Sequence, residues 1–135
     1  MKTTALQAFG LPVILMGMIF LLSSIPGDVE GGVLKVITTL EPSLQNLLHI
    51  PLFGLLQFLW LRGFASRGTT GAAAIAASFC ITLSYGALDE LHQYFVPGRY
   101  ASLLDLGLNL LGVVLGTLVF WLVTQTDLGR KIIGR

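Results

Sequence analysis

Apolar residues follow one another along this chain in long unbroken runs instead of alternating with polar ones. Three of these runs carry no charged residue, at positions 3–27, 68–88 and 106–126, and a fourth, at 42–61, holds only His49. A helix needs about 20 residues to cross a hydrocarbon core roughly 30 Å thick, so each run is long enough to span a membrane. Continuous runs favour helices, because the strands of a membrane barrel alternate between lipid-facing and lumen-facing residues.

The runs predict an all-α integral membrane protein, a four-transmembrane-helix bundle in one domain, residues 1–135. The first run could instead be a cleaved signal peptide after Lys2, but residues 22–26 make a poor cleavage site, which favours an uncleaved helix. The four helices are predicted at about residues 5–25, 43–61, 69–94 and 102–126.

The connection between the first two helices has a pattern of its own. Apolar residues recur at helical spacing from Asp28 to Glu41, interrupted by Gly31 and Gly32. This segment is predicted either as a short amphipathic helix lying along the outer interface or as an irregular loop. Helix propensity favours neither the amphipathic helix nor the loop for this segment.

Composition agrees with a membrane location and excludes some partners. The chain is 54% hydrophobic and 11% charged, with a mean hydropathy of +0.82, which lies outside the range of soluble domains. Its net charge of +1 comes from few, scattered cations, so no nucleic-acid partner is expected. Cys80 is the single cysteine, and it cannot form a disulfide within the chain.

Lysine and arginine are distributed unevenly around the predicted helices. Six of the eight lie before the first helix, between the second and third, and after the fourth, whereas the other two connections hold one cation and three acids each and are therefore acidic. By the positive-inside rule, the basic segments face the cytoplasm. We therefore expect both termini to be cytoplasmic and residues 89–105 to lie near the outer face.

Polar residues gather around the connection between the last two helices. The third helix is expected to continue to about Tyr94, followed by a turn at Pro97 and Gly98. Ser102 precedes Asp105 with the spacing of a helix N-terminal cap. N-capping is therefore a better interpretation of Ser102 than a role as nucleophile.

The fourth helix carries one stripe of polar and small residues. Asp105, Asn109, Gly112 and Gly116 recur at spacings of four, three and four, which places them on one face. Gly112 and Gly116 have the spacing of close-packed membrane helices, so this face should contact a neighbouring helix. Homo-oligomerisation through the two glycines is a further prediction.

His49 is expected to meet this polar face, because it lies early in the second helix, which starts on the same outer side. The whole set resembles the VanZ-like family, and the likeness covers the second half of the chain. The residues that carry it are Glu90-x-x-Gln93-x-Phe95-x-Pro97-x-Arg99-x-x-Ser102-x-x-Asp105-x-x-x-Asn109-x-x-Gly112-x-x-x-Gly116, with His49 on the preceding helix. The resemblance implies a small protein of the bacterial cytoplasmic (inner) membrane, and some members of the family are associated with teicoplanin resistance. It defines no reaction and no cofactor.

The chemistry of these side chains leaves binding and catalysis open. Glu90, Asp105 and His49 are the candidate acid and base groups if the protein is an enzyme. The candidate binding residues are Asp89, Gln93, Arg99, Ser102 and Asn109. Histidines and acids are numerous enough for a metal, but no compact ligand motif such as His-Glu-x-x-His occurs, so no metal is predicted.

A purely structural alternative is that Arg99 pairs with Glu90 or Asp105 and holds the loop in place, while Gln93 and Asn109 complete the hydrogen bonds. Ionisable groups at membrane depth favour a functional site instead. Three carboxylates against one arginine make the site acidic, which favours hydroxyl-rich or amine-bearing ligands over a bare phosphate. Two functions follow: a non-enzymatic envelope protein that binds a lipid-linked cell-wall precursor or glycopeptide, which we prefer, and a membrane-embedded hydrolase or transferase acting on an envelope lipid.

Overall fold

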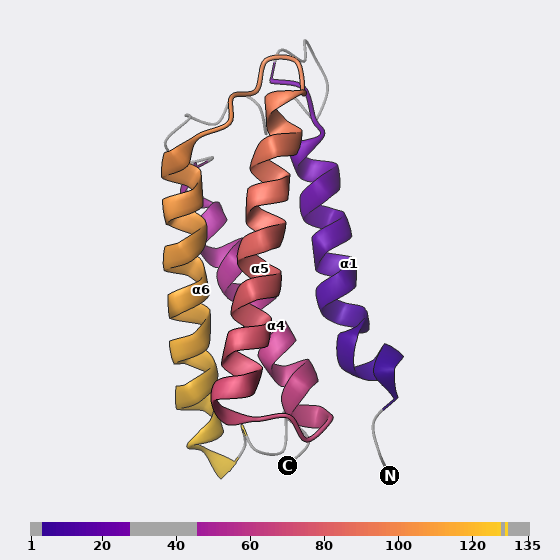
Figure 1. Ribbon diagram of the computed structural model, residues 1–135, viewed down its shortest axis with the longest axis vertical. Coiled ribbons are helices and arrows are strands. Elements are labelled where there is room, and N and C mark those ends of the chain that lie inside the picture. Colours follow the sequence, from indigo (N-terminus) through magenta and orange to yellow (C-terminus); the bar gives the residue numbers. More distant parts are fainter. Residues whose placement is uncertain (1–3, 28–45, 128, 130–135) are drawn as a thin grey trace.

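The described part of the protein is entirely helical. The computed structural model describes residues 4–27, 46–127 and 129, and no strand occurs among them. This agrees with the all-helical fold class predicted from the sequence. The helices are α1 (Ala5–Ser23), α4 (His49–Ser66), α5 (Gly71–Tyr94) and α6 (Leu103–Thr124) (Figure 1).

Three helices run lengthwise and the fourth is inclined to them. In Figure 1, α1, α5 and α6 extend along the long axis, and α4 lies behind α5 at an angle. Helix α4 packs against all three other helices, most extensively against α6. Its Phe53, Leu56 and Gln57 are fully buried. Helix α4 is therefore the centre of the bundle.

Helices α1, α5 and α6 are each long and apolar enough to cross a membrane. Helix α4 does not meet the same criteria, and its 18 residues correspond to a length of about 27 Å. It also carries His49, Gln57 and Arg62, which lower its hydropathy. The second helix predicted from the sequence, at about 43–61, thus exists as α4, but within the described residues only α1, α5 and α6 show the length and composition of a membrane span.

The boundaries of α4 differ from those predicted. This helix starts at His49 and ends at Ser66, whereas the sequence placed it at about 43–61. Arginine is a good helix former and can extend its charged end towards water, so Arg62 continues the helix instead of ending it. Gly68, with a φ of 89°, stands two residues after the end. Residues 43–45 and the predicted interfacial segment 28–41 lie outside the described residues.

Glycines allow α4 and α6 to approach closely. A Cβ at Gly116 would overlap the carbonyl oxygen of Gly54, and a Cβ at Gly112 would lie 2.5 Å from the carbonyl oxygen of Ile50. The predicted small-residue face of α6 therefore contacts α4 of the same chain. Homo-oligomerisation through these glycines remains a prediction, and it would require this face to leave α4.

A polar network crosses the middle of the bundle. The side-chain amide of Gln57 donates to the hydroxyls of Ser78 and Thr117, each at 3.0 Å, and its oxygen accepts from Thr82 at 3.0 Å. These bonds join α4 to α5 and α6. In an apolar surrounding an unpaired amide would be costly, so the network fixes how the three helices align.

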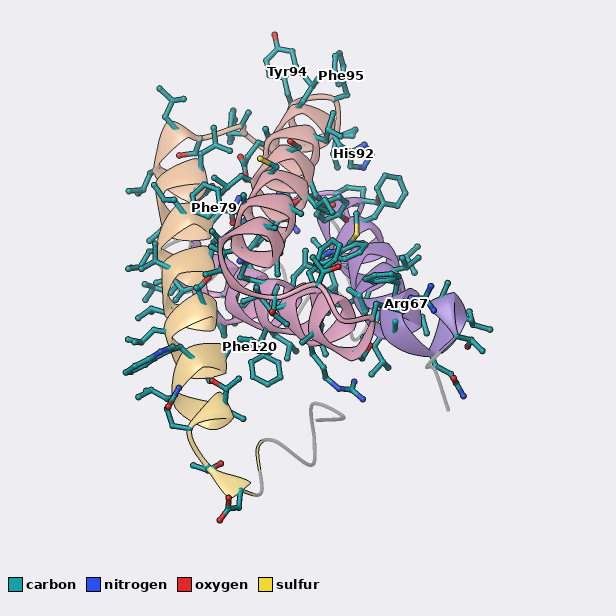
Figure 2. All side chains as sticks on the ribbon, turned by 60° about the horizontal axis from the view of Figure 1, so that its bottom comes forward. Arg67, Phe79, His92, Tyr94, Phe95 and Phe120 are labelled. Carbon is teal, nitrogen blue, oxygen red and sulfur yellow. The ribbon has the colours of Figure 1, made fainter. Side chains whose placement is uncertain are left out.

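The outer surface of the helices is apolar. Leu6, Leu103 and Trp121 are 82%, 87% and 57% exposed, and many other leucines and valines lie open on α1 and α6. Figure 2 shows Tyr94 and Phe95 pointing away from the bundle at the end of α5. So much exposed apolar surface is suited to contact with lipid.

Candidate functional site

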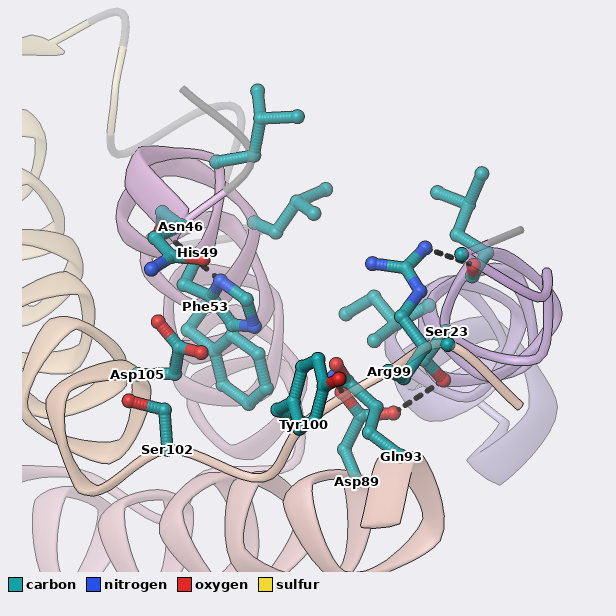
Figure 3. Close-up of a pocket in the computed structure, with 16 residues that line it drawn as sticks. Ser23, Asn46, His49, Phe53, Asp89, Gln93, Arg99, Tyr100, Ser102 and Asp105 are labelled. Atoms are coloured by element: carbon teal, nitrogen blue, oxygen red, sulfur yellow. Dashed lines mark hydrogen bonds between the residues drawn. The ribbon is translucent and has the colours of Figure 1, made fainter. Parts of the chain in front are cut away.

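A pocket of about 450 Å³ lies at the end of the bundle where α1 and α5 end and α4 and α6 begin. Its polar side chains form two groups (Figure 3). His49 and Asp105 lie on the side of α4 and α6, and Ser23, Asp89 and Gln93 lie on the side of α1 and α5. Tyr100, which is 86% exposed, stands between them in this view.

His49 is oriented by the backbone just before α4. Its Nδ1 lies 3.0 Å from the carbonyl oxygen of Asn46, and because a carbonyl only accepts, Nδ1 carries the proton. The other ring nitrogen, Nε2, lies 3.5 Å from Oε1 of Glu90. The imidazole of His49 on α4 therefore directs Nε2 at the carboxylate of Glu90 on α5.

Glu90 connects α5 to the beginning of α6. Its side chain is buried, and Oε2 accepts a hydrogen bond of 3.0 Å from the backbone N–H of Ser102. The hydroxyl of Ser102 accepts from the N–H of Leu104 at 3.1 Å, so Ser102 is the N-cap of α6 as predicted. Oε1 of Glu90 has no hydrogen-bond partner among the described residues. Glu90 thus has one oxygen bound to the backbone and one directed at His49.

Asp105 and Asn109 supply further buried polar atoms from α6. Asp105 lies in the first turn of the helix, where the positive end of the helix dipole stabilises its charge. Asp105 is 4% exposed and Asn109 is fully buried. Within the described chain, no hydrogen-bond partner is found for Oδ1 of Asp105 or for either side-chain amide atom of Asn109.

The three residues predicted as acid and base come together. One ligand-type atom from each of His49, Glu90 and Asp105 lies within 4.8 Å of the other two. They come from α4, α5 and α6, and topology alone predicted that they would meet. The structure therefore brings this trio to one point at the pocket end of the bundle.

Asp89 and Gln93 belong to the other side of the pocket. The hydroxyl of Ser23 donates to Oδ1 of Asp89 at 2.7 Å, and the amide of Gln93 donates to Oδ2 at 3.0 Å. Both carboxylate oxygens of Asp89 are therefore occupied by protein donors. Ser23 was not predicted as a site residue, because a serine inside an apolar run gives no signal of the helix it contacts.

Arg99 binds the end of α1. Its Nε donates to the carbonyl oxygen of Ile25 at 3.0 Å, and Nη2 lies 3.5 Å from that of Leu22. The structural alternative paired Arg99 with Glu90 or Asp105. The loop between α5 and α6 is held in place through other contacts. Glu90 accepts a hydrogen bond from the backbone N–H of Ser102, and Arg99 donates to carbonyl groups at the C-terminal end of α1, which have no partner within that helix.

The arrangement can bind or polarise a small polar group. Glu90 and Asp105 offer acceptor oxygens, Asn109 offers both a donor and an acceptor, and His49 can accept or release a proton. Among the described residues that line the pocket, Arg99 on the other side is the one cation apart from a protonated His49. The trio therefore attracts positive or hydrogen-donating groups.

The sequence matches one family of known proteins over most of its length. The family model described as VanZ/LLP1 matches residues 9–124. No curated protein and no solved structure matches the chain. Because the matched region contains α4, α5, α6, most of α1 and the whole trio, the likeness to VanZ seen in the sequence is confirmed, and the chain belongs to the VanZ/LLP1 family.

Proposed function

We propose that the protein spans a bacterial cytoplasmic membrane four times, with both termini inside and the pocket at the outer face. In Figure 1, α1 begins and α6 ends at the same end of the bundle, opposite the pocket. Arg62 and Arg67 lie towards that end, as the positive-inside rule requires of cytoplasmic segments. Helix α4 would then cross as a shorter helix surrounded by the other three.

We propose that the pocket binds the polar head of a lipid-linked or glycopeptide-type envelope ligand, and that this binding alters sensitivity to glycopeptide antibiotics such as teicoplanin. One observation supports a ligand site most directly: Oε1 of Glu90 and Oδ1 of Asp105 are buried, and neither has a hydrogen-bond donor among the described residues. A network serving only structure would satisfy them, as Ser23 and Gln93 satisfy Asp89.

The pocket fits such a ligand in size and chemistry. Its volume is within the usual range for small-molecule sites, about 300–1,000 Å³. Ile19, Leu22 and Leu52 line it beside the polar groups, so an apolar chain can lie next to a polar head. The acidic trio favours hydroxyl and amine groups on that head. Membrane lipid is the expected surrounding partner.

A second candidate function is a hydrolase or transferase acting on an envelope lipid. The orientation of His49 favours it, because a proton fixed on Nδ1 leaves Nε2 as the basic atom beside Glu90. In this scheme His49 takes a proton from water or from a ligand hydroxyl, and Asp105 or Glu90 stabilises the imidazolium that forms.

Incubation with a bacterial envelope lipid extract tests and separates the two functions. Purified wild-type protein and the Asp105→Asn variant are exposed to the extract, and mass spectrometry measures both retained lipids and new products. Retention without products supports binding, and products that disappear in Asp105→Asn support an enzyme. Cys80→Ser is the control, because Cys80 is exposed on α5 and outside the pocket.

If wild-type protein neither retains nor converts any component of the extract beyond the level of Asp105→Asn, the proposed function is wrong. Antibiotic sensitivity is a second measure. Cells lacking the protein should change their teicoplanin sensitivity when wild type or Cys80→Ser is restored, and should not when Asp105→Asn is restored at equal abundance.

A further inference from the structure

The contact between His49 and Glu90 contains an electrostatic conflict. Since Nδ1 of His49 donates to the Asn46 carbonyl, Nε2 of the neutral ring presents a lone pair. It faces Oε1 of Glu90 at 3.5 Å, which is also an acceptor. Two acceptors in a buried position need a positive centre between them, which is either a proton or a metal ion.

Asp105 extends this requirement to three groups. Its carboxylate reaches the same space, with donor atoms of the three residues within 4.8 Å of one another. Within the part of the chain that the structure describes, Oε1 of Glu90 and Oδ1 of Asp105 have no hydrogen-bond donor, and both residues are 4% exposed. A single proton on His49 satisfies one of these oxygens, whereas a cation satisfies both together.

We propose that His49, Glu90 and Asp105 bind one divalent transition-metal ion such as Zn²⁺ or Mn²⁺. Two carboxylates neutralise a dication, and one imidazole selects borderline metals over Mg²⁺ and Ca²⁺, which prefer oxygen ligands alone. Zinc bonds of about 2.0–2.2 Å place tetrahedral ligands about 3.4 Å apart. The observed 3.5 Å between His49 and Glu90 already matches that spacing, and the other pairs, which lie within 4.8 Å, would have to approach by up to about 1.4 Å as the ion binds.

The surroundings of the trio are those of a metal site. A histidine that binds a metal usually donates its other ring N–H to a backbone carbonyl or carboxylate, as His49 does to Asn46. Glu90 is held by the N–H of Ser102 on its other oxygen. Asn109 is fully buried on the same face of α6 as Asp105, and its amide has no hydrogen-bond partner among the described residues, so it is available for a hydrogen bond to a metal-bound water.

This inference deepens the proposed function, since it concerns the same pocket. Three protein ligands leave a coordination position open. His49 and Asp105 line the pocket, so a hydroxyl group of a bound head could occupy that position. The sequence predicted no metal because the three ligands lie on three helices, and no compact motif joins them.

Metal titration of the purified full-length protein tests the inference. After treatment with a chelator, the detergent-solubilised protein is titrated with ZnCl₂ alone by calorimetry, with MnCl₂, MgCl₂ and CaCl₂ in parallel. We expect one equivalent of Zn²⁺ or Mn²⁺ per chain and a raised thermal unfolding midpoint. Glu90→Gln, Asp105→Asn and His49→Gln should each lower the affinity about 100-fold or more. His92→Gln, which removes a histidine that contacts Ser24 instead of the trio, should retain it.

X-ray absorption on the wild-type zinc complex keeps the test decisive even if a variant fails to fold. Nitrogen and oxygen ligands without sulfur, together with affinity that falls as pH is lowered, support the trio. The inference is overturned if no saturable binding occurs, if Mg²⁺ or Ca²⁺ binds as well as Zn²⁺, if the spectrum contains sulfur, or if folded trio variants bind like wild type. Because the probe is the metal alone, failure here leaves the lipid-extract result unaffected.

Discussion

Replacing Gly116 with alanine should separate α4 from α6 and destabilise the bundle. The new Cβ would overlap the carbonyl oxygen of Gly54 and lie 2.9 Å from its Cα. Both atoms belong to a helix backbone and cannot rotate away, so the helices must move apart. Overpacking of this kind costs about 1–3 kcal/mol of unfolding free energy.

Gly107→Ala is the matched control for this experiment. Gly107 lies on the same helix, and a Cβ there meets nothing within 4 Å. Since alanine is favoured over glycine in a helix by up to about 1 kcal/mol, the control should be neutral or slightly stabilising. Both substitutions add a methyl group to α6, so the difference between the unfolding stabilities of the two variants isolates the contact with α4.

Unfolding of the purified protein in mixed micelles with increasing SDS measures both variants. Gly116→Ala should unfold at lower SDS and Gly107→Ala at the same or higher SDS than wild type. His49 lies on α4, so Gly116→Ala should also weaken zinc binding. Equal unfolding of the two variants would refute the close approach of α4 and α6.

Other substitutions test the remaining contacts. Gln57→Leu should destabilise the protein by about 0.6–2 kcal/mol in the same assay, because Thr82 loses its acceptor, and no loss would show that the network carries no stability. Ser102→Ala should cost about 0.5–2 kcal/mol through loss of the α6 cap while keeping the backbone bond to Glu90, so zinc affinity should remain within a few-fold of wild type, and a larger loss would contradict that separation. A cysteine in place of His49, in a Cys80→Ser background, should react with a membrane-impermeant thiol reagent from outside the cell, whereas labelling only after membrane disruption would reverse the proposed orientation.

The sequence predicted the helices well where apolar runs end at clear signals. Pro97 and Gly98 follow the end of α5, and Gly98 adopts the positive φ expected of it, 70°. Ser102 caps α6 as its spacing indicated. The beginning of α4 was less predictable, because Leu48 caps it without a side-chain hydrogen bond and no residue type marks the boundary.

The sequence predicted which residues form the site better than it predicted the contacts that they make. Topology placed His49 beside Glu90 and Asp105, since α4 and α6 both begin where α5 ends. The partner of Arg99 could not be predicted, because the carbonyl groups at the end of α1 carry no sequence signal. Both oxygens of Asp89 accept hydrogen bonds, whereas Oε1 of Glu90 accepts none among the described residues. This difference depends on the rotation of α5, which adjacent positions in the sequence cannot reveal.

Cross-linking between positions 49 and 105 tests the central claim most directly, namely that the histidine and acids of separate helices share one pocket. With His49→Cys and Asp105→Cys together in a Cys80→Ser background, a short bifunctional thiol reagent should join α4 to α6 within one chain, because the native side chains end within 4.8 Å of each other, and mass spectrometry of the digest should detect the linked peptides. The control pairs His49→Cys with Thr124→Cys at the far end of α6. A high yield for the first pair alone is predicted, and equal yields or no link would contradict the account.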